Sequence, residues 1–576
     1  MSHEILRKHM MNFPTESLKE FLGEDLVESL FEWYSGTGAF FTKARLSDMI
    51  LNIYGVSILK EKNFRRQLFK VLPQDEILEF RIDLLPEYKN CENVSKIIEV
   101  ITNAEWRENK INTHLLRLLS YETSDVFVKK DSEVKSTDLI SVYDKFYELL
   151  DYQYIIRQQA LNVLTSPYGL RRFLIHMPTG TGKTKTAMHI VCHHYNFNLN
   201  KKGLVIWIAH TAELLQQAYD TFVSVWKHVG NGDICTYKFW GDYAADDLDE
   251  NVSGFMVCSI QKLQSMMSNN SVLFNKLVSN ACLVVYDEAH KAAAPETKKV
   301  IEQFMTRKAD MPDRALMGLS ATPGRTTENS FDNDILVSMF GNKIISIDTK
   351  LMNSVNMSAQ EAANADVEPD IIKYFQKRGI LSKVIKEELT YSNTITEDEL
   401  NNIKVIATAN GYDDFSTATL EMIGRNRNRN MVILQKLREL NSQKKPTIVF
   451  ACSVKHGQLL SSMLTLNNVP NALVIGDMSP IDRKNAIDSF KDNESDVNIL
   501  INYEVLTTGF DAVNIECVFI ARPTQSVVLY SQMLGRGLRG PQMGGKEQCL
   551  LIDIKDNLEQ FNENMAFSHF NNYWNA

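Results

Sequence analysis

One stretch of the chain, residues 173–187 with the sequence FLIHMPTGTGKTKTA, limits the fold more than any other. Its apolar start predicts a short buried strand, and the residues after the loop are compatible with a helix. Glycines in such a loop let successive backbone N–H groups point at an anion, and the helix adds the positive end of its dipole. In this arrangement Lys183 reaches the terminal phosphates of a nucleotide, and the Thr184 hydroxyl binds Mg²⁺. Met177 occupies the place of the pattern's first glycine, so the loop is a variant.

A second stretch, residues 282–290, is an apolar strand that ends in Asp-Glu-Ala-His. An aspartate at the carboxyl end of a strand beside a phosphate loop can hold Mg²⁺ through its water shell, which points to Asp287. Glu288 is then placed to orient and deprotonate an attacking water.

The two stretches together resemble the motor core of superfamily 2 helicases, in the DEAH-box variety. Further stretches are similar to the remaining motifs of that family and follow in its order. They are residues 209–214 (motif Ia), 259–263 (motif Ib), 320–322 (motif III), 452–456 (motif IV), 506–511 (motif V) and 530–539 (motif VI). Motifs Ia and VI look most like those of the motor subunits of type I and type III restriction enzymes and of related bacterial repair and defence helicases.

The resemblance implies an α/β fold with two tandem RecA-like parallel-sheet motor domains and an N-terminal helical accessory domain. A length of 576 residues agrees, because it is too long for a single hydrophobic core. We expect the accessory domain over residues 1–145, the first motor domain over 146–345, a connecting segment with a helical insertion over 346–430 and the second motor domain over 431–576. Residues 380–392 are the candidate for the first strand of the second motor domain.

The same resemblance implies that ATP and Mg²⁺ bind between the two motor domains. Gln532, Arg536 and Arg539 are spaced to share one face of a helix, and the two guanidinium groups fit the oxygens of the γ-phosphate. We expect Gln159, or alternatively Gln158, to read adenine, because an amide offers both a donor and an acceptor. The residues expected at catalytic positions are Lys183, Asp287, Glu288, Gln532, Arg536 and Arg539. Those expected to bind the nucleotide are Gln159, Thr179, Gly180, Thr181, Gly182, Lys183, Thr184, Lys185, His290, Gly509 and Asp511, and those expected to bind Mg²⁺ are Thr184 and Asp287.

Motifs Ia, Ib, IV and V of the family contact the backbone of a nucleic acid, in part through strand ends and helix N-termini that hold phosphate groups. The residues expected to make these contacts are His210, Thr211, Ser259, Gln261, Ser453, Thr507 and Thr508.

The predicted function is therefore an ATP-dependent helicase or translocase that acts on nucleic acid, DNA rather than RNA. The alternative is an ATP-gated nucleic-acid sensor, or a motor subunit of a bacterial antiviral defence or restriction complex that does not itself unwind. That subunit would work with a separate nuclease or effector chain.

Composition limits the partners and the compartment. A net charge of −9 argues against a wholly basic nucleic-acid coat, but it is compatible with a local basic track. The eight cysteines form no CxxC pair, and reduced thiols fit a cytoplasmic location. No stretch approaches eighteen apolar residues, so we expect no membrane association.

Two basic runs leave their roles open. Arg65, Arg66 and Lys70 fit either a DNA-contacting helix-turn-helix or the solvated face of a helical bundle, and we favour the bundle. The arginines in residues 424–429 fit a phosphate-contacting track and a solubilising helix start equally well.

Overall fold

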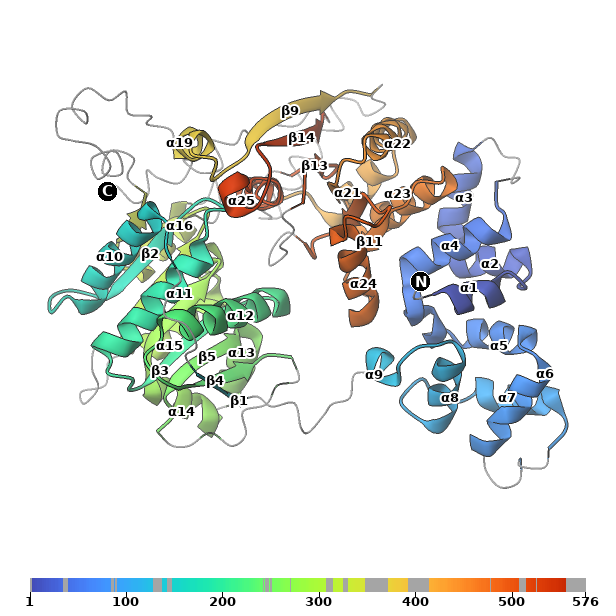
Figure 1. Ribbon diagram of the computed structural model, residues 1–576, viewed down its shortest axis with the longest axis horizontal. Coiled ribbons are helices and arrows are strands. Elements are labelled where there is room, and N and C mark those ends of the chain that lie inside the picture. The colour runs from blue at the N-terminus through green and yellow to red at the C-terminus, as the bar shows by residue number, and fades with distance from the viewer. Residues whose placement is uncertain are drawn as a thin grey trace.

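The computed structural model describes residues 3–34, 40–83, 88, 91–127, 137–141, 148–241, 243, 248, 251–269, 271–306, 314–324, 330–347, 371–391, 414–476, 478–506, 514–524 and 526–555. Within these residues the chain forms two sheets flanked by helices and a cluster of N-terminal helices (Figure 1). The predicted fold class, two parallel-sheet α/β units with a helical N-terminal region, is confirmed. None of the described helices is long and apolar enough to cross a lipid bilayer.

The first sheet is parallel except at one edge, where β1 runs antiparallel to β4. Its central strands are buried on both faces, and such strands read as continuous apolar runs. The order of its described strands is β1 (Thr137–Ile140), β4 (Ile234–Phe239), β5 (Gly254–Ser259), β3 (Leu204–Ala209), β6 (Ala281–Asp287), β7 (Ala315–Ser320), β2 (Arg172–His176) and β8 (Ile344–Ser346).

Helices cover both faces of this sheet because side chains alternate along each strand. Val205 and Trp207 of β3 share a core with one set of helices, whereas Leu204 and Ile206 share a core with the other. The first set is α10 (Asp151–Thr165), α11 (Lys183–His193) and α12 (Ala212–Val229), with the short η4 (His194–Asn198) after α11. The second set is α13 (Ile260–Ser268), α14 (Val272–Asn280), α15 (Pro295–Met305) and α16 (Ser330–Met339).

The second sheet is parallel throughout its described strands. Its order is β11 (Ala472–Val474), β12 (Ile499–Asn502), β10 (Thr447–Phe450), β13 (Cys517–Ile520), β14 (Gln548–Ile554) and β9 (Lys383–Leu389). One face packs on α22 (Arg427–Ser442) and α23 (Val454–Leu466), and the other on α24 (Pro480–Lys491) and α25 (Val527–Leu534). Three shorter helices are α19 (Ile371–Lys377), α21 (Thr417–Gly424) and η6 (Pro541–Met543).

The N-terminal helices, here called the N-terminal module, pack on the second sheet and not on the first, which follows them directly in sequence. Their apolar side chains share one core with α22, α23 and the strands beneath these helices. Figure 1 shows the module beside α21 to α24. Its elements are α1 (Glu4–Met10), α2 (Thr15–Leu22), α3 (Glu24–Trp33), α4 (Lys43–Tyr54), η1 (Gly55–Lys60), α5 (Lys62–Val71), α6 (Gln74–Glu79), η2 (Phe80–Asp83), α7 (Val94–Thr102), α8 (Lys110–Leu118) and α9 (Thr123–Val126).

A buried carboxylate on α24, Asp482, joins the module to the second sheet. Its Oδ2 accepts from the backbone N–H of Val56 at 3.0 Å, and its Oδ1 lies 3.3 Å from Nε2 of His3. The Ser479 hydroxyl also donates to Oδ2 at 2.7 Å. A buried carboxylate needs such partners, so this contact ties the start of the chain to α24.

The structure differs from two expectations for the first 145 residues, the surface position of Arg65 and the extent of the accessory domain. The side chain of Arg65 is buried and donates to the carbonyl oxygens of Leu59 and Lys60, so it supports the module and is not a DNA contact. Residues 137–140, within the range assigned to the accessory domain, form the edge strand β1 of the first sheet. Asp138 holds this strand by accepting from Tyr219 and Lys238. The domain limits at 145, 345 and 430 stay predictions.

The junction at Asp482 makes a prediction about Gly55. A Cβ added at Gly55 would lie 2.2 Å from the carboxyl carbon of Asp482, and its φ of +52° strains any other residue. We expect Gly55→Ala to lower the free energy of unfolding by about 1–3 kcal/mol for the backbone and by a further 1–3 kcal/mol for the disturbed buried carboxylate. Denaturant unfolding measures this loss.

Gly169→Ala is the matched control, because Gly169 also has a positive φ but a Cβ there meets nothing within 4 Å. It reports backbone strain alone. Equal losses of stability in the two variants would contradict the proposed tight junction at Asp482.

Candidate active site

The phosphate loop, residues 177–182, leaves the carboxyl end of β2 and leads into α11. Gly180 and Gly182 have φ angles of +87° and +78°, in the left-handed region that glycine adopts without strain. The hydroxyl of Thr181 donates to the carbonyl oxygen three residues earlier at 2.7 Å, which curls the loop back on itself. Met177 is fully buried, so the residue that replaces the pattern's first glycine belongs to the core beneath the loop.

The first turn of α11 carries the predicted phosphate and Mg²⁺ residues. Lys183 and Thr184 are its first two residues, and both are partly exposed beside the loop. The ammonium group of Lys185 donates to the carbonyl oxygen of Glu148 at 2.6 Å, so it holds the segment before α10 against α11.

Gln153, and not the predicted Gln159, contacts the phosphate loop. Nε2 of Gln153 donates to the carbonyl oxygen of Thr181 at 3.1 Å, and Oε1 accepts from the backbone N–H of Leu150 at 3.0 Å. The Tyr152 hydroxyl donates to the same Thr181 oxygen at 2.8 Å. Gln159 lies six residues further along α10, which places it roughly 9 Å away along the axis and on another side of the helix. The sequence does contain a signal, because a glutamine at the third helical position is typical of a capping box.

The carboxylates of Asp287 and Glu288 are brought together, as predicted, at the end of β6. Oδ1 of Asp287 accepts from the backbone N–H of Glu288 at 3.0 Å, and Glu288 has a φ of +54°, which is uncommon outside glycine. Burial and the adjacent Glu288 carboxylate raise the pKa of Asp287. Burial acts in the same direction on Glu288, but the charges of Lys183, Lys291 and Arg536 outweigh it and lower the pKa of Glu288. The surroundings therefore favour the ionised form of Glu288 more than that of Asp287.

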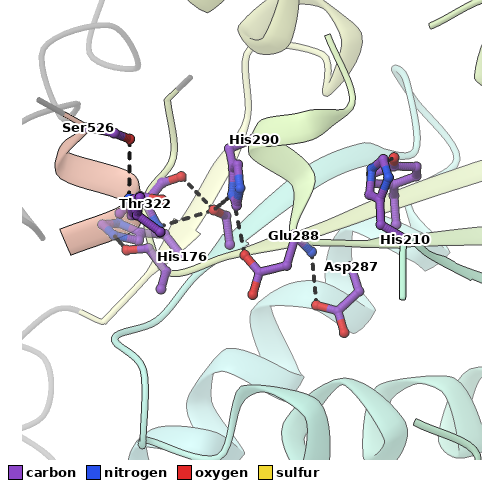
Figure 2. A network of polar contacts seen from close by, with 11 residues as sticks. His176, His210, Asp287, Glu288, His290, Thr322 and Ser526 are labelled. Carbon is purple, nitrogen blue, oxygen red and sulfur yellow. Dashed lines mark hydrogen bonds and ion pairs between the residues drawn. The ribbon is translucent and has the colours of Figure 1, made fainter. Parts of the chain in front are cut away.

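His290, in the short helix η5 (Ala289–Lys291), fixes the orientation of the Glu288 side chain (Figure 2). The hydroxyl of Ser320 donates to the carbonyl oxygen of Thr322 at 2.5 Å, so its oxygen accepts from Nδ1–H of His290 at 3.3 Å. The same Nδ1 lies 3.3 Å from Oε2 of Glu288. Burial lowers the pKa of His290 to about 3, so the ring is neutral at physiological pH. Ser320 of motif III is therefore hydrogen-bonded to His290.

The second sheet contributes Gln532 from α25 and the two arginines from the loop after it. The expectation that all three share one face of a helix is wrong, because α25 ends at Leu534 and Arg539 lies in a β-bridge with Leu381. Gly535 meets the phosphate loop so closely that an added Cβ would lie 2.5 Å from Cβ of Thr179. Arg536 and Glu288 influence each other electrostatically, since the Arg536 charge lowers the pKa of Glu288 and the Glu288 charge raises that of Arg536. A Cβ added at Gly180 would lie 3.7 Å from Cγ of Arg539. The structure therefore places both predicted arginines at the phosphate loop.

The donors of this site fit a polyanion such as the triphosphate of ATP. Among the described residues, Nε2 of Gln532 is buried without a hydrogen-bond partner. Burial lowers the pKa of Arg536 to about 10, although Glu288 acts in the opposite direction. Buried cations and an unpaired buried donor are costly unless an acceptor joins them. The carboxylate of Asp287 and the hydroxyl of Thr184 are oxygen ligands of the kind that Mg²⁺ accepts.

The predicted nucleic-acid residues sit at the N-termini of three helices. The hydroxyl oxygens of Thr211, Ser259 and Ser453 cap α12, α13 and α23. Nε2 of Gln261 donates to the carbonyl oxygen of His210 at 3.0 Å, so the starts of α12 and α13 lie together. The third helix, α23, which Ser453 caps, packs on the second sheet.

A salt bridge connects the start of α12, on the first sheet, to α24, on the second sheet. NH1 of Arg483, on α24, lies 2.8 Å from Oε1 of Glu213 in the first turn of α12. Sequence reasoning did not identify this pair, since nothing local links two residues so far apart. Four predicted residues, Thr507, Thr508, Gly509 and Asp511, lie outside the described residues.

Comparisons with known proteins agree with this geometry. Residues 146–325 match the family model described as "Type III restriction enzyme, res subunit", and residues 429–540 match "Helicase conserved C-terminal domain". A putative ATP-dependent helicase, IRC3, of Saccharomyces cerevisiae is 26% identical over 70% of this chain. A subunit of the type I restriction enzyme EcoAI of Escherichia coli is 21% identical over 68% of this chain and 44% of its own length.

The chain spans about half of the length of its yeast relatives, 51% of the Saccharomyces protein and 58% of a putative mitochondrial ATP-dependent helicase of Schizosaccharomyces pombe. Among solved structures, a fragment of a putative HsdR subunit of a type I restriction enzyme from Vibrio vulnificus is similar over 81% of this chain and 70% of that chain. Its sequence identity is 18% and its TM-score 0.46.

The two family matches contain the phosphate loop, the Asp287–Glu288 pair and the arginines of the second sheet. The chain therefore contains a res-subunit domain followed by a conserved C-terminal helicase domain, and the residues expected of an ATP-hydrolysing site lie in both.

Proposed function

We propose that this chain uses ATP hydrolysis to move along or unwind nucleic acid, with DNA as the substrate. The observation that carries the proposal is the close approach of the second sheet to the phosphate loop, where Gly535 meets Thr179 and Arg539 meets Gly180. The charge of Arg536, from the second sheet, also acts on Glu288 of the first. Because the hydrolytic site is built from both sheets, the charge on a bound nucleotide controls how tightly the sheets approach. Cycles of binding and hydrolysis then change the spacing between the helix N-termini of the two sheets.

Within the site, each residue has a distinct chemical task. The charge on Glu288 suits it to orient the attacking water and accept its proton. Lys183, Arg536 and Arg539 offset the negative charge of the phosphoryl group during its transfer. We assign Thr184 and Asp287 as the ligands of Mg²⁺, which when bound neutralises phosphate charge.

The preference for DNA rests on family similarity. The first sheet matches the res-subunit family model, and the chain is similar to a restriction enzyme subunit. The N-termini of α12, α13 and α23 supply the phosphate contacts, since such termini present N–H groups to anions. A cytoplasmic location also stays a prediction.

We reassign adenine recognition from Gln159 to Gln153. The Gln153 amide already donates once to Thr181 and accepts once from Leu150, which leaves one N–H and one lone pair. Adenine presents a matching acceptor and donor at N7 and its N6 amino group.

Gln153→Ala should raise KM for ATP about tenfold, because two hydrogen bonds to the base contribute roughly 1–3 kcal/mol together. It should also reduce the preference for ATP over GTP by a similar factor. Steady-state hydrolysis of both nucleotides measures these changes. Gln159→Ala on the same helix is the matched control and should stay within about twofold of wild type. A larger effect at Gln159 than at Gln153 would show that Gln159 recognises adenine, as the sequence predicted.

The motor function predicts that nucleic acid accelerates ATP hydrolysis. We would measure kcat with single-stranded DNA, duplex DNA, forked DNA and RNA, and test strand displacement on the forked substrate. We expect DNA to give the largest stimulation. Glu288→Gln should lower kcat by about 10²–10⁴ through loss of the general base while ATP still binds.

Lys183→Ala is the background control for contaminating hydrolysis. If RNA stimulates hydrolysis and DNA does not, the substrate is RNA and not DNA. Stimulation without strand displacement would favour a translocase, whereas hydrolysis unaffected by every nucleic acid would favour the sensor or partner-dependent subunit.

A further inference from the structure

Tyr286 is a buried polar residue that the proposed chemistry does not use, although it directly precedes Asp287. Its ring is fully buried among the helices on one face of the first sheet. Its hydroxyl lies 2.6 Å from Nε2 of His210, and the two rings meet edge to face with an interplanar angle of 82°. Burial raises the pKa of Tyr286, so the hydroxyl keeps its proton and forms a hydrogen bond with the neutral imidazole.

The register of the strands explains this contact. β3 and β6 are parallel neighbours in which Ile208 lies opposite Tyr286. His210 is two residues beyond Ile208, at the point where β3 gives way to α12. The imidazole therefore reaches across the end of the sheet toward the strand that carries Asp287 (Figure 2).

His210 is also connected to both helices that we assign to phosphate binding. It directly precedes Thr211, the cap of α12, and its carbonyl oxygen accepts from Gln261 in the first turn of α13. Both helix starts are thus linked to the imidazole and through it to the Tyr286 hydroxyl.

We propose that the Tyr286–His210 hydrogen bond couples nucleic-acid binding at the starts of α12 and α13 to the positions of Asp287 and Glu288. Tyr286 is a positioning residue in this scheme, since it acts through its chain neighbour and touches no reacting atom. The inference rests on the proposed function, because it needs a nucleic acid at His210.

The conformation of Glu288 makes such control effective. Its left-handed backbone is held by the residues around it and is sensitive to small shifts of β6. His210 lies near enough to Glu288 and Lys291 for their charges to influence its pKa, which burial lowers to about 4. The imidazole is therefore part of the same electrostatic environment as the hydrolytic carboxylate.

Tyr286→Phe tests the coupling because it removes one oxygen atom and keeps the ring. We expect basal ATP hydrolysis within about twofold of wild type and a five- to tenfold smaller stimulation by the nucleic acid that stimulates wild type best. His210→Gln should retain most of the stimulation, since a glutamine oxygen can accept from Tyr286. His210→Ala should lose it, and adding Tyr286→Phe to His210→Ala should cause little further loss.

Tyr195→Phe is the matched control. Tyr195 is another buried tyrosine, in η4 beside the first sheet, and its hydroxyl donates to the carbonyl oxygen of Lys201 at 3.0 Å. We expect it to lower the melting temperature as Tyr286→Phe does while leaving stimulation intact.

The outcomes separate this inference from the motor function. If wild type is stimulated and Tyr286→Phe is stimulated equally, the coupling is overturned and the motor function stands. A proportional loss of basal and stimulated rates in Tyr286→Phe also overturns it, because the residue would then act on catalysis itself. If wild type neither binds nor responds to nucleic acid, both proposals fall.

Discussion

The arrangement of the whole chain depends on two carboxylates, Asp287 and Glu288, buried side by side at the end of one strand. Two adjacent buried charges are unfavourable unless cations and donors surround them. Lys183 comes from the neighbouring phosphate loop and Arg536 from the other sheet, and both act on Glu288. The closed approach of the two sheets is therefore an electrostatic requirement of the site as well as a packing arrangement.

The N-terminal module is attached to the sheet that supplies Arg536 to this site. The module shares its core with the second sheet, and Asp482 fastens it to α24. The next residue, Arg483, forms the salt bridge to Glu213 at the start of α12. One turn of α24 therefore contacts the module on one side and the first sheet on the other. The module, α24 and the start of α12 are therefore joined by one continuous set of contacts.

Local sequence order predicted the phosphate loop, the Asp287–Glu288 pair and the two arginines, because each is a short pattern whose chemistry needs contiguous residues. It did not predict their backbone, since α25 ends at Leu534 and both arginines come after it. The contacts that it missed depend on helix phase or on tertiary packing. In sequence Gln153 differs from Gln159 only by its capping-box position, and the direction of α10 is what brings it to the phosphate loop. Arg65 reads as a surface cation, yet carbonyl oxygens surround it. The placement of the module on the second sheet has no sequence signal, because the pairing of two apolar surfaces is decided by the assembled fold.

Three histidines show how the ends of the first sheet's strands are connected. His176 of β2 donates to the carbonyl oxygen of Ala321 after β7, and His210 after β3 forms a hydrogen bond with Tyr286 of β6. His290 after β6 contacts Ser320 of β7. Burial lowers the pKa of each ring, to about 3, 4 and 3, and nearby lysines add to the effect. A neutral imidazole offers one donor and one acceptor, so each ring can join two strand ends without adding positive charge. The positive charge of the site thus remains on Lys183 and the arginines, where a phosphate can neutralise it.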